Sequence, residues 1–149
     1  MNPPTQPSDP LHQRIAASLA RQGMMQHLGV RLLRVAPGLC ELALPYSERV
    51  TQQQGGFHGG AVGALADIAG GYAALTVLPD EMEVTTVEYK INFLAAFQGG
   101  ELRATGRVVK AGRRIVVTCA EVQHFAAPDA EGAACALAQQ TLVPVPKTY

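Results

Sequence analysis

Residues 55–78 combine the residue types of a hydrolytic site within one continuous stretch. Four glycines and His58 fall within residues 55–60, and Asp67 is the one charged side chain in the apolar run that follows. Glycines let a ligand approach the free N–H groups of a first helical turn, which attract negative charge. A carboxylate inside an apolar helix is costly unless it is paired or used. Helix-start donors and a lone carboxylate together predict a hydrolytic site.

Plainer interpretations of both side chains stay open. Asp67 could be a structural residue bonded to a buried hydroxyl, because perturbed buried carboxylates cluster at functional sites without being confined to them. His58 could be an ordinary loop histidine, since a lone histidine does not by itself mark a site. The combination of the two within ten residues favours the functional interpretation.

The segment that must position these groups, residues 61–78, is expected to form a helix. Its length, with no proline before Pro79, favours a helix over a strand, although three internal glycines are poor helix formers. A helix that is apolar all round belongs in a core, wrapped by other structure. A membrane span is excluded because the segment is mostly alanine and glycine, lacks basic flanks, and carries Asp67 at a cost of roughly 3 kcal/mol.

Composition sets the class of protein. The length of 149 residues indicates a single domain, which is expected over residues 11–149, and residues 1–10 are expected to form a disordered tail. Twelve basic and twelve acidic residues cancel, so nucleic acid and an anionic membrane surface are not expected as partners. The polar, proline-rich start is not a signal peptide, and three widely spaced cysteines resemble reduced core residues, so a cytoplasmic location is expected. No closely spaced Cys or His pair suggests a metal site.

The elements around the central helix alternate between helix and strand patterns. Asp9 followed by Pro10 predicts a helix start, and Gly23 its stop. Turn signals separate the strand-like runs, which are residues 28–35, 39–44, 83–97, 102–109, 115–125 and 133–145. Two hairpins are expected, one at Pro37-Gly38 and one at residues 110–113. A sheet that curls around the one apolar helix satisfies both burial demands, which makes the fold class α+β.

This order of elements carries a family resemblance. The pattern G-x-x-H-G-G at residues 55–60, with Asp67 nine residues after the histidine, resembles the hotdog-fold acyl-CoA thioesterases, and within them the phenylacetate-pathway (PaaI-like) group. The resemblance covers roughly residues 24–145. It implies the hotdog fold, a curled antiparallel sheet wrapped around one central buried helix. It also implies an acyl-CoA substrate, no cofactor beyond the coenzyme A of that substrate, and a homodimer with shared active sites that forms a dimer of dimers.

The resemblance assigns roles within the glycine-rich stretch and the strand that follows. Asp67 matches the catalytic carboxylate, which acts as a general base on water or as a nucleophile. Gly60 matches the donor whose backbone N–H polarises the thioester carbonyl, and His58 the histidine lining the same spot. Gly59 and Thr86 are expected to contact substrate, Thr86 through a hydroxyl near the carboxylate.

Two further groups of site residues follow with less support. Gln52 stands where relatives often carry an Asn, six residues before the histidine, and a longer amide could still orient water. Lys110, Arg113 and Arg114 cluster at the tip of the second hairpin, where they could hold the phosphates of coenzyme A by charge and fork geometry. The alternative for the basic cluster is a solvated turn.

Hydrolysis of a thioester needs few catalytic groups, because a thiol with a pKa of about 8.5 leaves without a dedicated general acid. Gly60 and Asp67 are seven residues apart, about 10 Å along a helix, which is too far for both to meet one carbonyl carbon. Either the donor is not Gly60, or the carboxylate comes from a neighbouring chain. A twofold dimer satisfies the second alternative by setting Gly60 of one chain beside Asp67 of the other. Two other functions stay open: a hotdog hydratase or dehydratase acting on acyl thioesters, and a non-catalytic acyl-CoA binding module.

Overall fold

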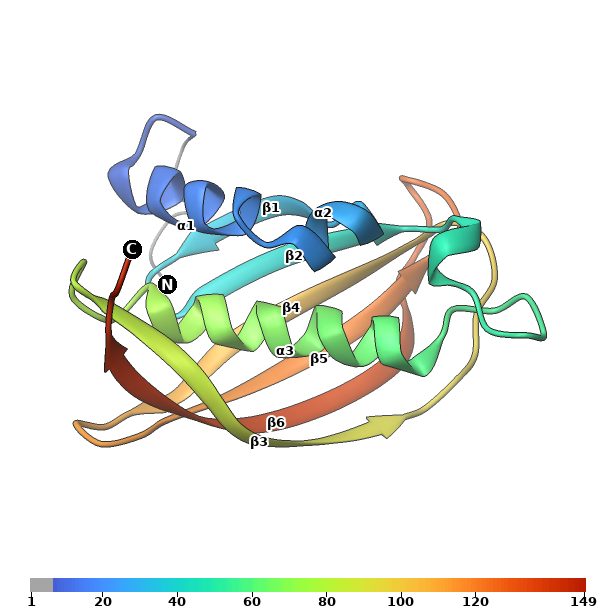
Figure 1. Ribbon diagram of the computed structural model, residues 1–149. Coiled ribbons are helices and arrows are strands. Elements are labelled where there is room, and N and C mark those ends of the chain that lie inside the picture. Colours follow the sequence, from blue (N-terminus) through green and yellow to red (C-terminus); the bar gives the residue numbers. More distant parts are fainter. Residues whose placement is uncertain (1–6) are drawn as a thin grey trace.

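The computed structural model describes residues 7–149 (Figure 1). Three α-helices and six β-strands follow one another as α1 (Pro10–Ala20), α2 (Gly23–Leu28), β1 (Arg31–Ala36), β2 (Leu39–Pro45), α3 (Gly59–Leu75), β3 (Met82–Phe93), β4 (Glu101–Ala111), β5 (Val116–Phe125) and β6 (Ala133–Pro146). The tail expected over residues 1–10 lies largely outside the described residues. The structure already starts α1 at Pro10, where the Asp9 side chain accepts a hydrogen bond from the Leu11 N–H at 2.8 Å.

All six strands form one antiparallel sheet in the order β1-β2-β4-β5-β6-β3. Figure 1 shows the sheet curling around α3, with α1 and α2 lying beyond the strands β1 and β2. This arrangement confirms the α+β prediction of a curled antiparallel sheet wrapped around one central helix. β3 follows α3 in the chain, yet it pairs with β6 and forms one edge of the sheet.

Both predicted hairpins are present. β1 pairs with β2 around a turn in which Gly38 has a φ of +77°, a left-handed conformation that favours glycine. β4 pairs with β5 around residues 112–115, where the Gly112 N–H donates to the Ile115 carbonyl at 2.9 Å. The Pro-Gly and Ala-Gly pairs in the sequence therefore mark the two turns correctly.

The structure corrects four predicted boundaries. Gly23 opens α2 instead of ending a helix, and the strand expected from residue 28 begins at Arg31, because Gly29 closes α2 with a φ of +80°. The strand expected over residues 83–97 ends at Phe93, and residues 94–97 turn away towards the loop ahead of α3. There the Phe97 carbonyl accepts from the Phe57 N–H at 2.9 Å. The central helix runs from Gly59 to Leu75 instead of over residues 61–78.

The core surrounds α3 on nearly all sides, as the apolar pattern of this helix predicts. Leu65, Ala66, Ala69 and Ala73 are fully buried in it. The helix crosses β4 so closely that a Cβ on Gly106 would lie 2.1 Å from the Ala69 carbonyl oxygen. A helix embedded this tightly in a sheet has little freedom to shift, so the groups that it carries are held in place. No helix within residues 7–149 is long and apolar enough to cross a membrane.

Candidate active site

The start of α3 is built from main-chain groups. His58 is the N-cap, and its Nδ1 accepts a hydrogen bond from the Gly60 N–H at 2.8 Å. The Ala61 and Val62 N–H groups donate to the His58 carbonyl at 2.9 and 3.1 Å. The Gly59 N–H has no hydrogen-bond partner among residues 7–149. The donor predicted at Gly60 is thus already paired within its own chain, and the donor beside it is open.

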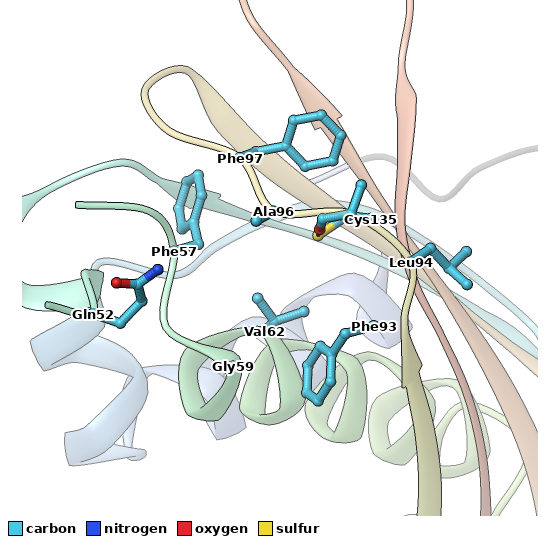
Figure 2. Close-up of a pocket in the computed structure, with 10 residues that line it drawn as sticks. Gln52, Phe57, Gly59, Val62, Phe93, Leu94, Ala96, Phe97 and Cys135 are labelled. Atoms are coloured by element: carbon cyan, nitrogen blue, oxygen red, sulfur yellow. The ribbon is translucent and has the colours of Figure 1, made fainter. Parts of the chain in front are cut away.

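A cavity of about 320 Å³ lies against this helix start. Figure 2 shows Gln52 and Phe57 on one side of it, Gly59 and Val62 below, and Phe93 on the opposite side. The lining is mostly apolar side chain, with the Gln52 amide as the polar side chain that reaches into it. Such a cavity suits an apolar group held beside a few polar contacts.

A tight turn presents Gln52 to the cavity. The Gln52 N–H donates to the Gly56 carbonyl, and the Gly55 N–H donates to the Gln52 carbonyl, each at 2.9 Å. Gly55 adopts a φ of +87°, which the turn requires. The Gln52 side-chain oxygen accepts from the Gln54 N–H. Of the three consecutive glutamines, Gln52 is therefore the one that lines the cavity.

Asp67 lies half-buried in the middle of α3 and is held by side chains from two strands. Its Oδ1 accepts from the Thr86 hydroxyl of β3 at 2.8 Å and from the Gln140 Nε2 of β6 at 2.9 Å. None of the described residues donates a hydrogen bond to Oδ2. The carboxylate thus has one oxygen fixed by neutral donors and one oxygen open.

A second, smaller cavity of about 100 Å³ opens at Asp67 and Thr86. Its far wall comes from α1 and from the end of α3. There the Gln22 amide donates to the Tyr72 hydroxyl at 2.7 Å, and that hydroxyl donates to the Ser18 Oγ at 3.1 Å. Burial raises the pKa of Tyr72 to about 12, so its hydroxyl stays protonated, and Glu83 also lines this cavity. Within one chain, Asp67 and the helix start therefore open into different cavities.

The sequence interpretation missed Gln140. This side chain is 1% exposed, and it faces inward with Ala138 and Leu142, two residues away on either side along β6. Alternation along a strand places residues i and i+2 on one face, so the parity of the predicted last strand contained the signal. A polar residue on the apolar face of a strand next to a helix with a lone carboxylate is the pattern that could have identified it.

The basic cluster lies apart from both cavities. Lys110, Arg113 and Arg114 are exposed at the β4–β5 hairpin, as predicted, and none of them lines either cavity within one chain. The structure therefore brings Gln52 to Gly59, and Asp67 to Thr86, but does not bring these basic residues to the site.

Cys40 and Cys135 are not activated as nucleophiles. Cys135 lines the larger cavity, where its Sγ approaches the Ala95 carbonyl at 3.7 Å, and burial raises the pKa of its thiol. Burial also raises the pKa of Cys40. Both thiols are protonated at neutral pH, and a thiol is a poor nucleophile compared with a thiolate. Within residues 7–149, no group of three or more His, Cys, Asp or Glu side chains is arranged to hold a metal ion.

Known proteins resemble this chain in sequence and in fold. The family model described as Thioesterase superfamily matches residues 54–125. A thioesterase family protein from Silicibacter pomeroyi is 38% identical, with a TM-score of 0.86 over 92% of this chain and 99% of its own. The 1,4-dihydroxy-2-naphthoyl-CoA hydrolase of Listeria monocytogenes is 33% identical over 92 residues, which are 61% of this chain and 74% of that protein. The PaaI protein of E. coli shares the fold at 21% identity, with a TM-score of 0.80 over 93% of this chain and 95% of its own.

Proposed function

The chain belongs to the thioesterase superfamily and has its hotdog fold, and from that premise we propose that it hydrolyses an acyl-CoA thioester to a free acid and coenzyme A. One observation carries the proposal. Asp67 projects from the buried central helix with Oδ1 held by two donors and Oδ2 open beside a cavity. A carboxylate prepared in this way can activate water or attack a carbonyl carbon. The name of the Listeria relative adds support, since it is a hydrolase of a CoA thioester.

In the proposed reaction, Asp67 takes a proton from water or attacks the carbonyl carbon itself. The new bond to carbon pushes negative charge onto the carbonyl oxygen, which an N–H group at the start of α3 stabilises. The carbon–sulfur bond then breaks, and coenzyme A leaves as a thiolate that takes up a proton. If Asp67 itself attacks the carbon, water then hydrolyses the anhydride between Asp67 and the acyl group, which releases the free acid and restores the carboxylate. No general acid is needed, because a thiol with a pKa of about 8.5 is a good leaving group.

The oxyanion donor belongs to Gly60 in this proposal, with His58 as its partner in the empty site. When the hydrogen bond from the Gly60 N–H to the His58 Nδ1 breaks, the Gly60 N–H can donate to a substrate instead. The open Gly59 N–H lies one residue away. Gln52 would orient the substrate or a water from the opposite wall of the cavity. These residues form one half of a site, and Asp67 with Thr86 forms the other half.

Two chains would supply the two halves. Gly60 and Asp67 both lie on α3, about 10 Å apart along its axis. A nucleophile and an oxyanion donor must each lie within roughly 3 Å of one carbonyl group. A twofold homodimer would place the helix start of one chain beside the carboxylate of the other. We propose such shared sites, in a dimer of dimers, for a cytoplasmic enzyme that needs no cofactor beyond its substrate.

The test is hydrolysis of a panel of acyl-CoA thioesters, followed as release of free thiol, with the Asp67→Asn variant beside the parent. We expect the parent to release thiol, and kcat to fall by about a hundredfold or more in the variant, the scale of general-base loss. The swap is nearly isosteric and removes a charge that is costly to bury, so thermal stability should hold or rise.

Asp129→Asn is the matched control, because it makes the same chemical change at an exposed carboxylate in the β5–β6 turn. It should leave kcat unchanged. If Asp67→Asn keeps kcat within a few-fold of the parent, Asp67 is structural and the mechanism is wrong. Loss of enoyl absorbance without thiol release would identify a hydratase, and binding without turnover would identify a binding module.

A further inference from the structure

We infer that Gln140 is a positioning residue, which fixes the Asp67 carboxylate so that Oδ2 is the oxygen that reacts. The inference rests on the proposed thioester hydrolysis and adds a residue on β6 to it. Gln140 lies 73 positions from Asp67 in the sequence and belongs to no pattern that identified the site.

The amide nitrogen of Gln140 contacts Asp67 at two points. It donates to the carboxylate Oδ1 at 2.9 Å and to the Asp67 main-chain carbonyl at 3.2 Å. It also lies 3.4 Å from the Thr86 hydroxyl oxygen. The Gln140 amide thus connects the Asp67 carboxylate, the Asp67 main-chain carbonyl and the Thr86 hydroxyl. Such a clamp restricts the rotation of the carboxylate before any substrate arrives.

The hydrogen bonds converge on one oxygen. Thr86 and Gln140 both donate to Oδ1, at 2.8 and 2.9 Å, and no described residue donates to Oδ2. Because both donors are neutral, they orient the carboxylate without neutralising its charge. The lone pairs of Oδ2 stay free to accept a proton from water or to attack carbon. The geometry therefore distinguishes a held oxygen from a reactive one.

Gly70 leaves the space that the amide occupies. A Cβ at Gly70 would lie 2.0 Å from the Gln140 Oε1 and 2.7 Å from the Thr118 Oγ1. A glycine inside a helix costs about 1 kcal/mol relative to alanine, so its presence in α3 needs a reason. The reason here is steric, since any other side chain would push the Gln140 amide away from Asp67.

Thr118 provides the comparison that separates positioning from packing. It lies directly opposite Gln140 in the β5–β6 ladder, is fully buried, and faces the same gap at Gly70. Its hydroxyl has no hydrogen-bond partner among residues 7–149, and it makes no contact with Asp67 through hydrogen bonds. Gln140 and Thr118 therefore share burial and neighbours but not the bond to the carboxylate.

The experiment compares Gln140→Met with Thr118→Val by kcat, KM and thermal unfolding. Gln140→Met keeps the length and burial of the side chain and removes the donor. We expect kcat to fall by about tenfold or more, because a hydrogen bond to a charged group contributes more than a neutral one, with KM changed less than about twofold. Thr118→Val keeps the shape and removes an unpaired hydroxyl, so kcat should stay at the parental value.

Gly70→Ala tests the same amide from the helix side. The added methyl should displace Gln140 and lower kcat to a similar extent, and combining it with Gln140→Met should add little further loss. If Gly70→Ala does not fold, the comparison of Gln140→Met with Thr118→Val still tests the inference. Parental kcat in Gln140→Met, or equal losses in Gln140→Met and Thr118→Val, would overturn the inference.

The outcome for Asp67→Asn separates this inference from the proposed function. Turnover lost in Asp67→Asn but kept in Gln140→Met means that Asp67 acts without Gln140. Turnover kept in Asp67→Asn means that the proposed mechanism itself fails.

Discussion

The start and the middle of α3 make their halves of the site by different means. At the start, the functional groups are main-chain N–H groups, one bonded to His58 and one open. In the middle, the functional group is the Asp67 side chain, held by Thr86 and Gln140 from two strands. The start depends on local sequence, whereas the middle depends on contacts formed across the fold. The two regions open into different cavities within one chain, which is why the proposed site draws its halves from two chains.

The largest expected effect comes from separating the two halves onto different chains. Asp67→Ala removes the carboxylate and Gly60→Pro removes the N–H, and each variant alone should be inactive. A mixed dimer would rebuild one good site from two undamaged halves. Unfolding and refolding the two variants together should recover about a quarter of parental activity, if subunits pair at random.

The control for this mixture is each variant refolded alone, which should stay inactive. Mixed dimers can be shown by tagging one variant and measuring how much of the other is captured with it. Mixed dimers without recovered activity would place the whole site within one chain, and the halves would then have to meet by a rearrangement of α3.

A smaller effect is expected from the basic cluster, which lies outside both halves. Neutralising Arg113 and Arg114 together, as glutamines, should raise KM for acyl-CoA severalfold and spare a pantetheine thioester. Only the former substrate carries the distant phosphates that the two guanidinium groups would hold. Equal changes of KM for both substrates would move the phosphate site elsewhere. Arg49→Gln, which removes one positive charge at another exposed arginine, is the control.

The smallest effect concerns stability at the start of α3. His58→Ala removes the N-cap and should lower the free energy of unfolding by about 1 kcal/mol, measured by thermal or denaturant unfolding. His58→Asn supplies a side-chain oxygen as the cap acceptor in place of the His58 Nδ1 and should recover most of that loss. Asp67→Asn should show the opposite sign, which would sharpen the contrast between a stabilising cap and a costly buried charge. A stable His58→Ala variant would mean that the cap contributes little here.

The contrast between the two halves also explains what the sequence could predict. His58, Gly59 and Gly60 are consecutive, and glycine has few reasons to be repeated ahead of an apolar helix. The local pattern therefore predicts a helix start at this point of the chain. Asp67 was recognisable because a charge inside an apolar helix is rare. The hairpins and the curled sheet followed from turn residues and from the burial demands of one helix.

The main features that the sequence did not predict depend on contacts between distant residues. Gln140 reaches Asp67 across 73 positions, and a neighbour at that distance leaves no periodic trace near the carboxylate. One boundary error has a local cause: Gly29 closes a short helix whose last residue, Leu28, the apolar pattern assigns to the following strand. The end of β3 at Phe93 is set by the Phe57–Phe97 main-chain bond, which joins two segments 40 residues apart.

The placement of β3 at the edge of the sheet has a consequence for how the chain folds. β3 leaves α3 but pairs with β6, the last strand to be made, so this pairing closes a long loop. Contacts with large sequence separation form slowly, because the chain loses the conformational entropy of the closed loop before those contacts stabilise the structure. Thr86 and Gln140 lie on these two strands, and their hold on Asp67 requires that late closure. During synthesis, the start of α3 can form as soon as the helix emerges, whereas the carboxylate gains its partners only when nearly the whole chain is present.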